Sequence, residues 1–232
     1  MTLRAGLVLL TALAFAASPF LVPGFGGYEP SQFPVRIEDP PVQPAGYAFG
    51  IWGVIYAWLI VMAAFGVWKR RDDPAWDATR LPLVVSLGIG AIWLPVAEAS
   101  PVWATVLIFA MLVPALIALL RTPGSDLWLL RAPVGLYSGW LTAASCVSLG
   151  LLLAGYGVPP LGAVGWAIAA LSLALAVAVA MLRARASLMY GLAAAWALIA
   201  VFVKNGADLV GLFAIGAALF VAALTLRRLS RA

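Results

Sequence analysis

Apolar residues follow one another along this chain in eight long runs that short polar segments separate. A run of about 20 apolar residues, rising about 1.5 Å per residue as a helix, is long enough to cross the hydrocarbon core of a bilayer. Helices are expected because backbone groups in lipid must bond within their own segment, and the alternating pattern of a membrane barrel is absent. The pattern predicts eight spans, at residues 5–22, 47–68, 81–97, 101–120, 132–154, 161–182, 187–203 and 208–226.

Composition agrees with this pattern. Of the 232 residues, 65% are apolar and 10% charged, whereas about a quarter of the residues of a soluble domain are charged. The expected fold class is therefore all-α, a polytopic transmembrane helix bundle. The net charge of +5 does not indicate a nucleic-acid partner, because the basic residues lie between the apolar runs.

The basic residues also indicate an orientation. If the N-terminus is inside, twelve of the fourteen Lys and Arg residues fall in inner segments, and only Arg36 and Lys204 fall outside. Basic side chains resist translocation. We expect an integral protein of a bacterial inner membrane with both termini cytoplasmic.

A second interpretation concerns the N-terminus. Arg4, an apolar run and then Ala14-Phe15-Ala16 resemble a signal peptide with its cleavage site. Cleavage of residues 1–16 would leave seven spans. The loop that follows keeps its outer position under either interpretation.

That loop, residues 23–46, contains six prolines and several glycines. Proline fixes φ and stiffens a loop, and loops of this length are usually functional or disordered. The loop leads directly into an aromatic-rich span that begins GYAFGIWGVIYAW at Gly46.

Aromatic side chains share a face on two of the spans. Phe49, Trp52 and Tyr56 follow the i, i+3, i+7 spacing of one helix face. Tyr137, Trp140 and Ala144 repeat the spacing on the fifth span, and Trp93 lies in the outer half of the third. These residues either line a cavity between helices or form an interfacial belt with ordinary packing.

The sequence predicts no catalytic residues, no metal site and no cofactor. It has no His and one Cys, Cys146, within an apolar run. The polar residues near the outer ends of spans are expected to be solvated turn residues, with a proton or ion path as the less favoured alternative: Glu98, Lys204, Asn205 and Asp208. Hydroxyls on the fifth span could bond a ligand or, as is more usual, their own or a neighbouring helix: Thr142, Ser145 and Ser148.

Two motifs carry a family resemblance. Pro44 leads into Phe49, with Trp52 and Tyr56 forming W-x-x-x-Y, and the fifth span carries YSGWLTAA from Tyr137 to Ala144. Over roughly residues 1–155 the chain resembles the tryptophan-rich sensory protein/translocator protein (TspO/MBR) family. Three further spans follow, and Ile89, Gly90 and Ala91 stand near the position of the asparagine typical of that family, so the chain looks like an extended, divergent member.

The resemblance implies a five-helix core, residues 1–155, with a cavity beneath the long loop, and an addition of three helices, residues 156–232. It implies a ligand site lined by Phe49, Trp52, Tyr56, Trp93, Tyr137, Trp140 and Ala144. Members of the family bind tetrapyrroles and in some cases sterols or other lipids.

We therefore expect a membrane binding or sensory protein for a hydrophobic planar molecule, with membrane lipids as its surroundings. Kinking prolines within eight spans keep a small-molecule or lipid transporter as the alternative, and a pigment-modifying enzyme is less favoured because the sequence lacks His. Small-residue helix faces permit a homodimer.

Overall fold

The computed structural model describes residues 2–22 and 27–231 and contains eight long helices. Each is long and apolar enough to cross a membrane, and the described residues form no strand. The predicted all-α bundle of eight spans is therefore confirmed. The helices are α1 (Thr2–Leu21), α2 (Ile51–Lys69), α3 (Pro74–Ala99), α4 (Pro101–Leu120), α5 (Ala132–Gly155), α6 (Ala163–Ala184), α7 (Leu188–Asn205) and α8 (Leu209–Leu229).

The largest difference from the predicted boundaries is at α3, which begins at Pro74 instead of residue 81. The Asp73 carboxylate accepts a hydrogen bond from the Ala75 amide at 2.9 Å, and Pro74 occupies the first helical position. Both features start a helix. The apolar pattern missed this turn because it contains charged residues, which a helix tolerates where it leaves the lipid.

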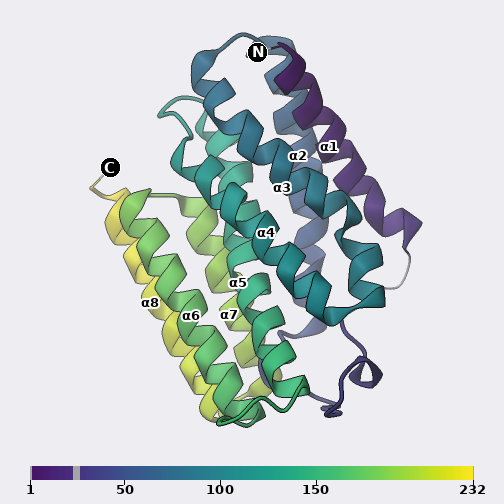
Figure 1. Ribbon diagram of the computed structural model, residues 1–232. Coiled ribbons are helices and arrows are strands. Elements are labelled where there is room, and N and C mark those ends of the chain that lie inside the picture. Colours follow the sequence, from purple (N-terminus) through teal and green to yellow (C-terminus); the bar gives the residue numbers. More distant parts are fainter. Residues whose placement is uncertain (1, 23–26, 232) are drawn as a thin grey trace.

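Helix α5 is the centre of the bundle. It packs against α2, α4, α6 and α7. Of the residues in its most apolar stretch, 72% are buried, whereas the share is 28% in α1 and in α2. Its approach to α7 is close, since a Cβ added at Gly139 would lie 2.5 Å from the Tyr190 carbonyl oxygen. In Figure 1, α6 and α8 lie on the left side of the bundle, α1 lies on the right, and α4 runs across the middle of the view.

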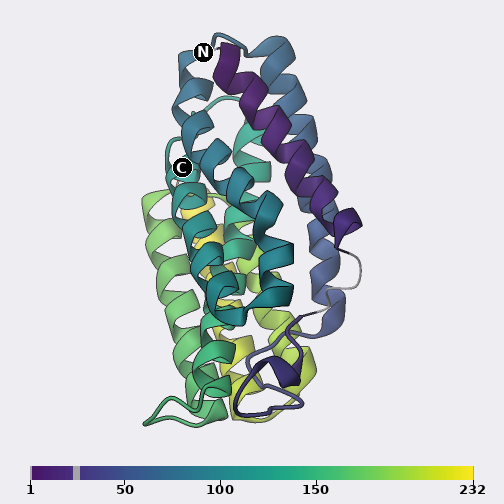
Figure 2. The same cartoon turned by 45° about the vertical axis from the view of Figure 1, so that its right-hand side comes forward.

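The two ends of the bundle differ. Figures 1 and 2 show both termini toward one end and the loop that precedes α2 at the other. We call these the terminal end and the loop end. The loop's first four residues, 23–26, lie outside the described residues.

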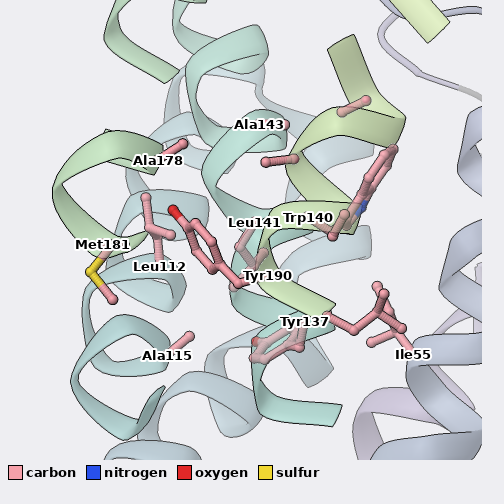
Figure 3. Packing of buried hydrophobic residues seen from close by; sticks show 14 of the residues in the cluster. Ile55, Leu112, Ala115, Tyr137, Trp140, Leu141, Ala143, Ala178, Met181 and Tyr190 are labelled. Atoms are coloured by element: carbon pink, nitrogen blue, oxygen red, sulfur yellow. The ribbon is translucent and has the colours of Figure 1, made fainter. Parts of the chain in front are cut away.

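Three large aromatic side chains fill the middle of the bundle: Tyr137, Trp140 and Tyr190. The Tyr190 hydroxyl bonds Thr142 Oγ1 at 3.0 Å, so that a polar group deep in the core is paired. Figure 3 shows Tyr190 and Trp140 extending toward opposite sides of the view. The Tyr190 ring packs within the helix layers, whereas Trp140 borders a cavity.

Candidate ligand-binding cavity

A cavity of about 290 Å³ lies near the loop end. Its walls come from α1 to α5, from α7 and from the loop before α2. Six of the seven residues that the sequence indicated as a site lie in this wall: Phe49, Trp52, Tyr56, Trp93, Trp140 and Ala144.

The aromatic faces of α2 and α5 meet in the cavity wall. The rings of Trp52 and Tyr56 stack, with centroids 5.4 Å apart. The Trp140 ring meets Trp52 edge-on at 6.1 Å and Phe49 edge-on at 5.9 Å. Edge-to-face and offset-stacked pairs are the favourable aromatic geometries, so these rings hold one another in fixed orientations.

Phe15 of α1 completes this aromatic cluster and was missed from the sequence. Its ring centroid lies 4.9 Å from that of Tyr56 and 5.6 Å from that of Trp52. The ring also covers Gly90, where an added Cβ would lie 2.8 Å from ring carbons of Phe15. A glycine thus makes room for Phe15 near the position of the asparagine typical of the family. A phenylalanine in an apolar run gives no signal of such a role.

Tyr137 is not among the lining residues. Its ring lies behind Phe15, with centroids 5.8 Å apart, and is fully buried. The hydroxyl shares a hydrogen bond of 2.8 Å with Ser86 Oγ, and Ser86 donates to the Met111 carbonyl at 2.7 Å. Tyr137 therefore supports the cavity wall from the α3 side.

Trp140 carries the most unusual polar group of the cavity. Its side chain is 2% exposed, and its indole Nε1 has no hydrogen-bond partner among the described residues. Two other indoles near this end are paired, because Trp93 Nε1 donates to the Ala104 carbonyl at 2.9 Å and Trp196 Nε1 to the Ala48 carbonyl at 3.2 Å. A buried donor without a partner costs about 1–3 kcal/mol, which an acceptor on a bound molecule would recover.

A chain of hydroxyls forms the polar edge of the cavity. Tyr28 of the loop shares a hydrogen bond of 3.0 Å with Ser148 Oγ, which is 2.9 Å from Thr105 Oγ1. Burial raises the pKa of Tyr28, and its hydrogen bonds to Ser148 and Thr105 oppose that shift. The phenol is therefore neutral at physiological pH. Ser148 joins the loop to α5 and α4 instead of bonding only its own helix.

The first half of the loop is fixed to the ends of α3 and α5. Gln32 Nε2 donates to the Glu98 carbonyl at 2.9 Å, and the Val35 amide donates to the Gly155 carbonyl at 2.8 Å. The Phe33 ring lies on Gly155, where an added Cβ would collide with ring carbons. Glycine is therefore required there for the loop to lie flat on the bundle.

The second half of the loop is fixed to α7. Lys204 Nζ lies 2.7 Å from an Asp39 carboxylate oxygen, and Asn205 Nδ2 donates to the Pro41 carbonyl at 2.9 Å. The Ala45 amide donates to the Ala200 carbonyl at 3.0 Å. Lys204 and Asn205, expected as solvated turn residues, thus tie the loop down, because the described loop folds back over the turn that carries them.

Asp208 and Glu98 have more ordinary positions. The Asp208 side chain caps α8 by accepting from the Gly211 amide at 2.7 Å, and Glu98 is exposed at the end of α3. In the described part of the chain, Asp, Glu and Cys side chains form no cluster of three or more that could hold a metal. The cavity is suited to bind and orient a molecule through apolar contact and a few hydrogen bonds.

These features define a polytopic helical membrane protein with an aromatic cavity beneath a tethered loop. A family model described as TSPO-like protein matches residues 24–227. The chain belongs to the TSPO-like family, a group of membrane proteins with sensory or binding roles. The match extends through α6 and α7 and into α8. Searches of curated proteins and of solved structures found no match.

Proposed function

We propose that this protein binds a hydrophobic planar molecule, such as a tetrapyrrole or a sterol, in the cavity beneath the loop. The observation that carries the proposal is the unpartnered indole N–H of Trp140, which borders a cavity walled by Phe15, Trp52 and Tyr56. Flat rings complement such walls, and a carbonyl, carboxylate or hydroxyl oxygen on the ligand would accept from Trp140. The aromatic walls of this cavity of about 290 Å³ favour a ligand that can lie flat against them.

The loop would act as the cover of this site. Its tethers to α3, α5 and α7 are separate hydrogen bonds, each worth about 1 kcal/mol, and one ion pair. They can break one after another to admit a ligand from the loop end. Tyr28 and Ser148 would then supply the polar contacts at the mouth.

Titration with protoporphyrin IX, followed by tryptophan fluorescence, tests the proposal. We expect saturable quenching in the purified protein and about tenfold weaker binding in Trp140→Ala and in Trp52→Ala, because each loses a buried ring contact. Trp68→Ala is the matched control, since Trp68 is 75% exposed at the far end of α2.

A sterol is tested by competition against the bound porphyrin. The proposal fails if no tetrapyrrole or sterol binds saturably, or if Trp68→Ala weakens binding as much as Trp140→Ala does.

We also propose that the loop end faces outward and the termini face the cytoplasm, because twelve of the fourteen basic residues lie in segments at the terminal end. Impermeant thiol labelling of intact cells should modify Arg36→Cys but not Ser230→Cys. Cys146 is buried and gives little background. Labelling of Ser230→Cys alone would show that the protein has the opposite orientation.

A further inference from the structure

A second cavity, of about 700 Å³, lies at the terminal end between the start of α5, the connection from α6 to α7 and the end of α8. Four arginines line it: Arg131, Arg185, Arg228 and Arg231. No Asp or Glu lines it, and within residues 2–22 and 27–231 none of the four has a carboxylate within ion-pair distance. We name this space the arginine cavity.

Two of its guanidinium groups are drawn to the same carbonyl oxygen. Arg131 Nη2 donates to the Pro123 carbonyl at 2.6 Å, and Arg185 Nη2 donates to it at 3.1 Å and also to the Thr122 carbonyl. The Nε atoms of Arg131 and Arg185 are buried and have no hydrogen-bond partner in the part of the chain that the structure describes. Two like charges and two unused donors are therefore held side by side, an arrangement that an anion would stabilise.

Arg228 is positioned in a similar way. Its Nε donates to the Leu182 carbonyl at 3.2 Å and its Nη2 to the Arg183 carbonyl at 2.8 Å. These bonds fix the guanidinium against the end of α6 without neutralising it. Arg231 is exposed at the rim and makes no hydrogen bond or ion pair among the described residues.

Other arginines at the terminal end, in contrast, form ion pairs with carboxylates. Arg70 lies 2.8 Å from an Asp126 carboxylate oxygen, and Arg80 lies 3.3 Å from Asp77. Asp126 stands in the connection that borders the arginine cavity, but its carboxylate is used by Arg70 and by Trp76 Nε1 at 2.9 Å. Asp126, the acidic side chain nearest in sequence to Arg131, therefore already pairs with Arg70, which follows α2, and with Trp76 of α3.

The remaining wall of the arginine cavity is apolar. Leu127 is 50% exposed and Trp128 is 61% exposed, and Leu188, Met189 and Leu229 also line the space. A small soluble anion would leave these side chains uncovered, whereas an acyl chain would cover them. Basic pockets between helices near a membrane surface hold the head groups of anionic lipids.

We propose that the arginine cavity binds an anionic phospholipid. Its phosphate lies against Arg131 and Arg185, its head group reaches Arg228 and Arg231, and its acyl chains leave along Leu127 and Trp128. The site joins α5 to α6, α7 and α8 and so ties the C-terminal helices to the rest of the bundle through a lipid.

Native mass spectrometry of the detergent-purified protein tests this, with phosphatidylglycerol and phosphatidylcholine of the same acyl chains as probes. We expect phosphatidylglycerol to be retained at least about tenfold more strongly, because only it carries net charge for the arginines. Arg131→Gln/Arg185→Gln should lower that retention about tenfold. The control Arg183→Gln/Arg227→Gln removes two charges from exposed positions of the same end outside the cavity and should change it less than about twofold.

Because Arg185 also bonds backbone carbonyls, Arg231→Glu serves as a variant that leaves those bonds intact, and it should weaken retention about threefold. Millimolar glycerol phosphate should not displace the lipid. Equal retention of the two lipids, an equal loss in the control pair, full retention in Arg231→Glu, or displacement by glycerol phosphate would each overturn the proposal.

Discussion

The aromatic cavity and the arginine cavity share walls from α5 and α7 but leave different hydrogen-bond donors unsatisfied, a neutral indole in the first and charged guanidinium groups in the second. The first, of about 290 Å³, has aromatic walls and one unpartnered indole N–H, on Trp140. The second, of about 700 Å³, has four arginines without a carboxylate partner among the described residues. We therefore propose a flat ligand with an acceptor atom for the first and an anion for the second.

Because the two cavities share helices, we expect a change in the packing of these helices to affect both. Helix α5 carries Trp140 to one cavity and follows Arg131 at the other, and α7 supplies Ala197 to one wall and Leu188 to the other. The contact between α5 and α7 near Gly139 therefore lies between both sites.

The largest effect is expected from adding a side chain at the contact between α5 and α7. Gly139→Ala places a Cβ 2.5 Å from the Tyr190 carbonyl oxygen, and such overpacking costs about 3 kcal/mol. The melting temperature should fall, and both porphyrin and phosphatidylglycerol binding should weaken. Gly53→Ala is the matched control, because a Cβ there meets nothing within 4 Å. Loss of only one of the two binding activities would show that the cavities are independent.

A smaller effect, confined to the aromatic cavity, is expected from releasing the loop. Asn205→Ala removes the hydrogen bond to the Pro41 carbonyl and should raise the porphyrin dissociation rate about fivefold, since one such bond contributes about 1 kcal/mol. Stopped-flow fluorescence measures the rate. Arg36→Ala, an exposed change on the same loop, should leave it unchanged, and an equal rise in both variants would contradict the tether.

The smallest effect is expected from removing the ion pair between Arg70 and Asp126 at the terminal end. The hydrogen bond from Arg70 lowers the pKa of Asp126, so the stability from this pair is present above the ordinary aspartate pKa of about 4 and is lost as the pH falls below it. Asp126→Asn should lower the melting temperature at neutral pH by about 2 °C and reduce its acid dependence. Phosphatidylglycerol retention should not change. A large loss of retention would show that Asp126 belongs to the lipid site.

The eight helices could be predicted because every one of them is a long apolar run, which in lipid has few alternatives to a helix. Boundaries were less certain where charged residues continue a helix, as Asp77 and Arg80 do in α3. The placement of the C-terminal helices around α5 depends on close contacts such as that at Gly139, which one sequence does not specify. The division into a core of residues 1–155 and an addition stays a prediction.

Helical spacing indicated the α2 and α5 faces of the aromatic cavity, because the residues around Trp52 and those around Trp140 each follow the i, i+3, i+7 spacing of one helix face. Spacing could not find Phe15 or Tyr28, which reach the cavity from separate segments, nor could it show that Tyr137 lies behind the wall. The sequence did not indicate the arginine cavity, because basic residues between spans by themselves indicate only orientation. Their lack of carboxylate partners is a property of the folded structure.

The most direct test of the account is the indole N–H resonance of Trp140 in a ¹⁵N-labelled sample, assigned from its absence in Trp140→Phe. Addition of a porphyrin ligand should shift this resonance as the N–H gains an acceptor beside the macrocycle, and should leave that of Trp128, in the arginine cavity, in place. Phosphatidylglycerol should shift the Trp128 resonance and leave that of Trp140 in place. A Trp140 resonance that stays unchanged at saturating porphyrin would contradict the claim that this indole receives the ligand.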